Sequence, residues 1–113
     1  MLSPENNARL TKVSQGTPMG MLMRRYWTPV TFSSEVTVRD GPPIRVRLFG
    51  EDLVLFRDTS GSLGLIADQC PHCLASMFFG RNEDNGLRCV YHGLKFDVTG
   101  ACTDLPCVPP VAP

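Results

Sequence analysis

The sequence lacks any hydrophobic run approaching the roughly 20 residues that a membrane-spanning helix needs. Its start, Met1 to Leu10, also lacks the apolar core of a signal peptide. We therefore expect a cytoplasmic protein with no membrane partner. A reducing compartment disfavours structural disulfides, so the presence of five cysteines favours metal binding or catalytic thiols over cross-links. Cys102 and Cys107 are expected to be ordinary small side chains.

The sequence also lacks an excess of charge of either sign. Eleven Lys and Arg residues balance eleven Asp and Glu residues, so no net positive field is available to bind nucleic acid. The pair Arg24 and Arg25 is too short to change this, and we expect it to form part of a solvated face. A chain of 113 residues is long enough for one hydrophobic core and too short for two.

The first 28 residues are expected to form a helical extension. Ser3 followed by Pro4 and Glu5 is typical of a helix start, and a short helix through about Leu10 follows. The same signal recurs at Thr17 before Pro18, and it predicts a second helical turn or two up to Met23.

From residue 29 onwards, apolar and polar residues alternate with the period of a half-buried strand. The alternation and the turn residues between the runs predict strands at Val30–Ser33, Ile44–Leu48, Leu53–Phe56, Leu63–Ala67 and Leu87–Tyr91. The predicted fold class is all-β, a small antiparallel domain of barrel or sandwich form spanning 29–106. Residues 107–113 are rich in proline and are expected to form a tail or a linker.

Two short motifs contain both histidines of the chain. Cys70-Pro71-His72 is followed, after sixteen residues, by Cys89-Val90-Tyr91-His92. Two thiolates on one iron and two imidazoles on the other would hold a 2Fe-2S cluster. Two alternatives remain open: a structural zinc site with the same four ligands, and a site with no metal at all. Zinc fingers usually keep their two cysteines in one pair, whereas each pair here is mixed.

These motifs, with their flanking residues, resemble the Rieske domain at the N-terminus of ring-hydroxylating oxygenases of the phthalate dioxygenase type. The resemblance rests on the ligand motif and on Gly16–Gly20, Arg24–Trp27, Phe79–Glu83, Leu87–Gly93 and Lys95–Asp97. It implies a Rieske-type β fold and a 2Fe-2S cofactor bound through iron. It further implies that Cys70 and Cys89 hold the inner iron and that His72 and His92 hold the exposed one.

The resemblance implies electron transfer as the function. The cluster would accept electrons from a reductase or a ferredoxin and pass them to a mononuclear non-haem iron. Such an iron is bound by two His and one carboxylate, and both histidines are already assigned to the cluster, so we expect the catalytic domain to be absent. The chain would then be an oxidoreductase component with no catalytic residues of its own, part of a homotrimer in a full-length form. The alternative is a self-contained ferredoxin-like carrier.

The first motif departs from the family pattern, which commonly reads Cys-Pro-His-Arg-Gly-Ala-Ser. Here Cys73 and Leu74 replace the arginine and the glycine, and Leu94 stands where the family usually has tryptophan. A leucine would adopt the positive φ of such a glycine only under strain. Cys73 is open to two interpretations, an inert thiol or a spare ligand and redox-active thiol. Any disulfide of Cys73 would have to involve Cys102 or Cys107.

Overall fold

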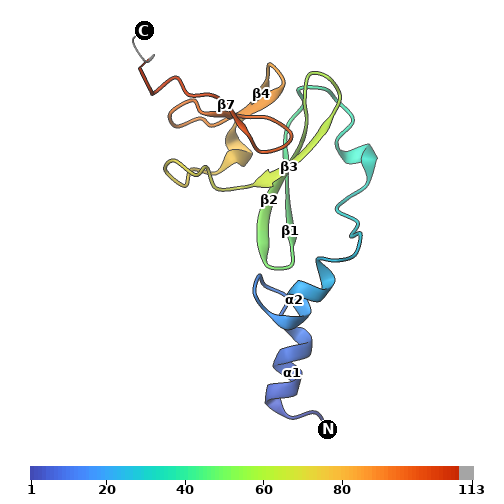
Figure 1. Ribbon diagram of the computed structural model, residues 1–113. Coiled ribbons are helices and arrows are strands. Elements are labelled where there is room, and N and C mark those ends of the chain that lie inside the picture. Colours follow the sequence, from blue (N-terminus) through green and yellow to red (C-terminus); the bar gives the residue numbers. More distant parts are fainter. Residues whose placement is uncertain (110–113) are drawn as a thin grey trace. The chain divides into compact units, whose positions relative to one another are not determined.

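The computed structural model describes residues 1–109 and divides into two compact units. One unit comprises Met1–Val30 and Arg47–Glu51, and the other comprises Thr31–Val46 and Asp52–Pro113. Figure 1 shows the course of the chain and labels most of its helices and strands. The two units are described separately below, beginning with the helical one.

Both N-terminal helices begin where the sequence predicts. Helix α1, Pro4–Thr11, is capped by Ser3, whose hydroxyl accepts a hydrogen bond of 3.2 Å from the backbone N–H three residues later. Helix α2, Pro18–Met23, is capped in the same way by Thr17, again at 3.2 Å. Each helix carries proline in its first turn, where a backbone N–H would have no helical partner. Local capping chemistry therefore sets both helix starts.

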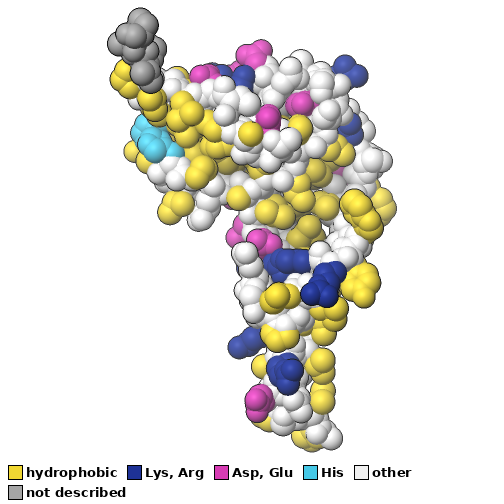
Figure 2. Space-filling model, in the orientation of Figure 1, with side chains coloured by type: hydrophobic (Ala, Val, Ile, Leu, Met, Phe, Trp, Pro, Cys, Tyr) yellow, Lys and Arg dark blue, Asp and Glu magenta, His cyan; other side chains and the backbone are white. Residues whose placement is uncertain are grey.

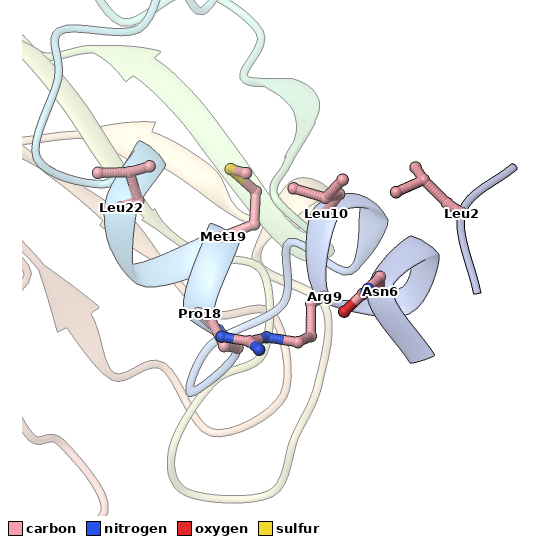
Figure 3. Close-up of a pocket in the computed structure, with 7 residues that line it drawn as sticks. All are labelled: Leu2, Asn6, Arg9, Leu10, Pro18, Met19 and Leu22. Atoms are coloured by element: carbon pink, nitrogen blue, oxygen red, sulfur yellow. The ribbon is translucent and has the colours of Figure 1, made fainter. Parts of the chain in front are cut away.

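An apolar hollow of about 310 Å³ lies between the two helices. Figure 3 shows Leu10, Met19 and Leu22 following one another along one edge of this hollow, with Arg9 and Pro18 on the other edge. Neither helix has a buried large side chain. Mutual contacts and caps, rather than a core of their own, therefore hold these helices.

Arg24 ties the end of α2 to the rest of its unit, so the expectation that this arginine is solvated is wrong. Its side chain is only 26% exposed and pairs with the Glu51 carboxylate at 2.9 Å. The guanidinium also donates to the carbonyls of Val13 and Gly20, both at 2.9 Å, and lies 5.4 Å from the centre of the Phe49 ring. The Gly20 carbonyl also accepts from the Arg24 backbone N–H at 3.2 Å, and a carbonyl oxygen, with two lone pairs, can accept a second hydrogen bond from the guanidinium.

Seven strands in the described residues form two sheets. The three-stranded sheet contains β1 (Ile44–Leu48), β2 (Glu51–Arg57) and β3 (Leu63–Ala67), in that order. The four-stranded sheet contains β4 (Arg81–Glu83), β5 (Gly86–Arg88), β6 (Lys95–Phe96) and β7 (Cys102–Asp104), in that order. Strands β2 and β3 are antiparallel, as are all neighbours in the second sheet. The predicted class, antiparallel β with short N-terminal helices, is confirmed.

The strand expected at Val30–Ser33 is wrong. This segment belongs to neither sheet and leads into a short 3₁₀ helix, η1 (Ser33–Glu35). Phe32 is 80% exposed, and its backbone N–H donates to the Glu35 carboxylate at 3.3 Å. A hydrogen bond to a nearby side chain thus replaces the hydrogen bonds between strands. The alternation of apolar and polar residues does not by itself supply a partner strand. A second 3₁₀ helix, η2 (Met77–Phe79), precedes β4.

Within residues 1–109, no helix is long and apolar enough to cross a bilayer. The tail expected at 107–113 is described only as far as Pro109, and residues 110–113 lie outside the described part. A turn precedes that point, closed by the Val108 N–H donating to the Leu105 carbonyl at 3.1 Å.

The hydrophobic core of the second unit includes two cysteines. Its buried members are Val54, Phe56, Cys70, Met77, Leu87, Cys89, Leu94 and Phe96. Side chains from β2, β5 and β6 thus surround the two thiols. Strand β3 contributes Gly64, whose lack of a side chain lets the Phe56 ring approach closely.

Substituting Gly64 with alanine tests this close approach. An added methyl group would lie 2.7 Å from the Phe56 ring and 2.8 Å from the Val98 Cα. We expect Gly64→Ala to lower the free energy of unfolding by about 1–3 kcal/mol, measured by urea denaturation. Leu63→Ala is the control, because Leu63 is 48% exposed and its truncation should change stability by about 0.5 kcal/mol or less. Equal midpoints for the two variants would contradict the packing described.

Candidate functional site

Loop 1, residues 70–75, carries the first motif and follows β3. Two backbone hydrogen bonds of 2.8 Å close it: the Cys70 N–H donates to the Ala75 carbonyl, and the Leu74 N–H donates to the Cys70 carbonyl. The residues on either side of the loop pair as an isolated antiparallel bridge. The loop is therefore a tight turn whose first residue is a core cysteine.

Loop 2, residues 89–94, carries the second motif and joins β5 to β6. The Cys89 N–H donates to the Leu94 carbonyl at 2.8 Å, and the Gly93 N–H donates to the Cys89 carbonyl at 3.2 Å. The strand expected at Leu87–Tyr91 therefore ends just before the cysteine. Both loops use the same closure, so the two cysteines hold equivalent positions although their histidines follow at different spacings.

The two motif thiols are neighbours in the core. Cys70 is 1% exposed and Cys89 is 3% exposed. Burial raises the pKa of the Cys70 thiol, the backbone N–H of His72 donates to the sulfur and lowers that pKa, and the Cys89 thiol within hydrogen-bonding reach raises it again. Backbone donors aimed at a buried sulfur suit a thiolate, which is the ligand form of cysteine.

The two motif histidines lie together at the surface. The ring centres of His72 and His92 are 4.6 Å apart with an interplanar angle of 65°, and the Tyr91 ring centre is 3.9 Å from that of His92. Both imidazoles are accessible to solvent, and Figure 2 shows them as one patch among hydrophobic side chains. The structure thus arranges the four residues singled out by the sequence as two pairs, with the thiols inside and the imidazoles outside.

Leu74 has the left-handed backbone conformation that a glycine at this position would supply and that a leucine adopts only under strain. Its φ is +59°, and the equivalent residue of loop 2, Gly93, has a φ of +80°. The shared loop closure demands a left-handed residue four positions after each cysteine. Glycine meets this demand freely, whereas leucine places its Cβ close to the following carbonyl, at a cost of roughly 1–2 kcal/mol.

The four motif residues fit a 2Fe-2S cluster better than a single ion. A cluster has two irons, so its thiolates and its imidazoles form two separate pairs. In residues 1–109, the potential metal-ligating atoms that lie within 4.8 Å of one another include both imidazoles but neither buried thiol. Tetrahedral zinc would need all four atoms around one point. The donor set and its division into pairs therefore match the cluster.

Arg88 is a positioning residue that the sequence analysis missed. Its guanidinium donates to the Gly93 carbonyl of loop 2 at 2.6 Å, and it pairs with Glu83 at 3.0 Å and Asp104 at 2.8 Å. The hydrogen bonds to the carboxylates of Asp104, first, and Glu83 raise the pKa of Arg88. Its place immediately before Cys89 was visible in the sequence, but its partners come from three other segments.

A second charged group supports loop 1. The Ser76 hydroxyl donates to the Asp68 carboxylate at 2.7 Å and accepts from the Arg45 guanidinium at 3.0 Å. The same carboxylate accepts from the Phe78 N–H at 3.1 Å, and Arg45 lies 4.5 Å from the Phe78 ring centre. The Asp68 carboxylate, two residues before loop 1, thereby binds the segment that follows the loop. Ser76 belongs to the family pattern around the first motif, so the sequence could have indicated its part in this group. Nothing in the sequence around Arg45 on β1 indicated that it takes part.

Exchanging residues at the left-handed positions should change stability in opposite directions. Leu74→Gly relieves the strain but makes the unfolded chain freer by roughly 0.5–1 kcal/mol, so we expect a net gain of about 0.5–1 kcal/mol. Gly93→Ala should cost about 1–2 kcal/mol, since its new methyl group also lies 3.0 Å from Pro106. Thermal unfolding of all variants in the same metal state measures both effects. Leu74→Ala is the control, because it removes the side chain but keeps the Cβ and should show no gain.

Removing the Arg88 guanidinium should destabilise loop 2. We expect Arg88→Leu to cost about 2 kcal/mol, because the Gly93 carbonyl loses a charge-assisted hydrogen bond. Arg81→Leu is the matched control: Arg81 also pairs with Glu83, at 3.3 Å, but its side chain is 68% exposed, so the cost should be about 0.5 kcal/mol or less. Urea denaturation compares the two, and similar losses would show that Arg88 acts only as a surface ion pair.

Comparison with known proteins agrees with this site. The family described as Rieske [2Fe-2S] domain matches residues 26–113. The phthalate 4,5-dioxygenase oxygenase subunit of Pseudomonas putida is 53% identical over 105 residues, covering 93% of this chain and 24% of that protein. The 5,5'-dehydrodivanillate O-demethylase oxygenase subunit of Sphingobium sp. is 53% identical over 106 residues, covering 94% and 24%. The chain thus spans about a quarter of the length of these curated relatives.

Solved structures show the same fold. The crystal structure of dicamba monooxygenase bound to dicamba has a TM-score of 0.64 and 30% identity, covering 71% of this chain and 24% of that one. Pseudomonas putida CBB5 NdmA has a TM-score of 0.67 and 30% identity, covering 81% and 29%. The resemblance drawn from the motifs is confirmed. This chain belongs to the Rieske [2Fe-2S] domain family and matches the N-terminal part of ring-hydroxylating oxygenase subunits.

Proposed function

We propose that this chain transfers single electrons through a 2Fe-2S cluster, as the Rieske portion of an aromatic ring-hydroxylating oxygenase. Cys70 and Cys89 hold one iron, and His72 and His92 hold the other. The observation that carries the proposal is the pairing of two adjacent buried thiols with two adjacent solvent-accessible imidazoles on equivalently closed loops. When bound, the cluster supplies reversible one-electron oxidation and reduction.

The surroundings of Cys70 and Cys89 shield their sulfurs from water and stabilise negative charge on the Cys70 sulfur. Core side chains around Cys70 and Cys89 exclude water from their sulfurs. The backbone N–H groups of His72 and Cys73 both donate to the Cys70 sulfur, which stabilises negative charge there. Neighbouring Leu94 is 6% exposed and extends this apolar shell behind loop 2.

The imidazole pair offers the short route to a redox partner. Because His72 and His92 are solvent-accessible, a partner can approach them directly. Exposed apolar side chains on the same loops give that partner a surface to contact: Leu74 is 65% exposed, Val90 58% and Tyr91 64%. The electron donor would be a reductase or a ferredoxin, and the acceptor a catalytic domain.

The acceptor iron has no place in these 113 residues. A site of two His and one carboxylate needs histidines, and the only two in the sequence serve the cluster in this proposal. Relatives about four times as long, named as oxygenase subunits, favour a portion of a larger oxygenase over a self-contained carrier. The names of these relatives support an aromatic substrate for the whole system, and a homotrimeric full-length form fits the same proposal.

Analysis of metal and sulfide in the purified chain tests the proposal. Protein produced with iron and sulfide available should be red-brown, with about two irons and two acid-labile sulfides per chain. Single alanine substitutions of Cys70, His72, Cys89 or His92 should each reduce the bound iron to a small fraction, because each removes one ligand. Chemical reduction should give the electron paramagnetic resonance signal of a reduced 2Fe-2S cluster.

Cys102→Ser is the control, since Cys102 is an exposed cysteine in β7 and its substitution should leave the iron content unchanged.

The chain should accept electrons but produce no hydroxylated aromatic, even with oxygen and a reductase present. Lack of iron and labile sulfide in the unsubstituted chain, prepared with both available and with no zinc added, would refute the assignment. Full iron content after loss of a motif histidine would also refute it.

A further inference from the structure

Cys73 is the residue of loop 1 that the proposed cluster does not use. It is exposed and free in the structure. In the motif that this loop resembles, its position carries an arginine, whose positive charge would repel a cation. The replacement therefore removes a charge and adds a soft ligand at the same point beside His72.

The Cys73 sulfur lies with the two imidazoles in space. One potential ligand atom from each of His72, Cys73 and His92 lies within 4.8 Å of the other two. Loop 1 supplies two of these side chains and loop 2 supplies the third. Neither of the buried thiols, Cys70 and Cys89, belongs to this group within the described residues.

The spacing of these three atoms is close to that of one tetrahedral ion. Zinc binds imidazole nitrogen at about 2.0–2.1 Å and thiolate sulfur at about 2.3 Å, so its ligand atoms lie roughly 3.3–3.6 Å apart. Starting from separations of at most 4.8 Å, a closure of at most about 1.2–1.5 Å is enough, which rotation about exposed side-chain bonds can supply.

We propose that His72, Cys73 and His92 form a mononuclear site for a borderline divalent ion, such as Zn²⁺ or Co²⁺, when the chain holds no cluster. One thiolate and two neutral imidazoles select these ions over Mg²⁺ and Ca²⁺, which prefer oxygen ligands. The fourth coordination position faces solvent, where water binds. The ion enters and leaves without opening the core.

This site and the cluster exclude each other, because both need His72 and His92. The surface site uses an accessible thiol, whereas the cluster needs the two buried ones. Zinc bound at the surface therefore holds the imidazoles away from an incoming cluster. Cys73 makes cluster loading sensitive to zinc.

Cobalt titration of the cluster-free 113-residue chain tests the site directly. We expect one Co²⁺ per chain, with tetrahedral ligand-field bands and a near-ultraviolet charge-transfer band of the strength given by one thiolate. Cys73→Ser should abolish the charge-transfer band and raise the Kd at least tenfold. His72→Ala should also weaken binding at least tenfold, since it removes one of the two imidazoles.

Cys102→Ser is the matched control, because it removes an exposed thiol outside the group and should leave the titration unchanged. Cys89→Ser, which alters a buried thiol, should likewise keep the one-thiolate band. A band that survives in Cys73→Ser, or one with the strength of two thiolates, would show binding by a thiol other than Cys73 and overturn the proposal. Failure of the unsubstituted chain to bind Co²⁺ stoichiometrically would also overturn it.

Zinc competition then tests the consequence for loading. One equivalent of Zn²⁺ added before iron and sulfide should slow cluster formation several-fold in the unsubstituted chain and leave the rate in Cys73→Ser unaffected. Equal slowing in both would refute the role of Cys73. Failure of both chains to form a cluster without zinc would instead refute the proposed electron-transfer function, and the cobalt titration would stand independently.

Discussion

The placement of two thiols side by side in a hydrophobic core is the constraint on which the rest of this domain depends. Cys70 and Cys89 each begin a loop that leaves the core and returns to it within six residues. The same two backbone hydrogen bonds close both loops, and this closure forces a left-handed residue at the fifth position. Core packing, loop length and backbone conformation are therefore consequences of one requirement.

Charged groups complete the support, because the strands beside the loops are short. Strand β5 has three residues and β6 has two, so their ladders contain few hydrogen bonds. Arg88 adds hydrogen bonds beyond those between the strands, because its guanidinium links the Gly93 carbonyl of loop 2 to two carboxylates. Asp68 does the equivalent for loop 1 through Ser76. A buried sulfur pair is thus held by polar contacts at the edge of the core rather than by sheet pairing alone.

Features determined by neighbouring residues could be predicted from the sequence, and those determined by distant partners could not. Ser3 caps its helix through a contact three residues away, so the start was readable. The strand at Leu63–Ala67 was predicted with its observed ends. Val30–Ser33 has the same alternation but found no partner strand in the described residues. The role of Arg24 depends on Glu51, twenty-seven positions later, and no local pattern indicates such a pairing. The ligand motif was found because two residue types recur at spacings that chance rarely produces.

Loop 1 shows how one backbone can keep its geometry while its chemistry changes. Leu74 accepts the left-handed conformation at an energetic cost and leaves the loop closure intact. The preceding residue, Cys73, carries a thiol that is exposed to solvent, whereas the thiols of Cys70 and Cys89 are buried. An ion arriving from solution therefore meets the exposed sulfur and the imidazoles first, and it meets the buried sulfurs only if the loops admit it. Accessibility, as much as intrinsic affinity, decides which metal species such a chain binds first.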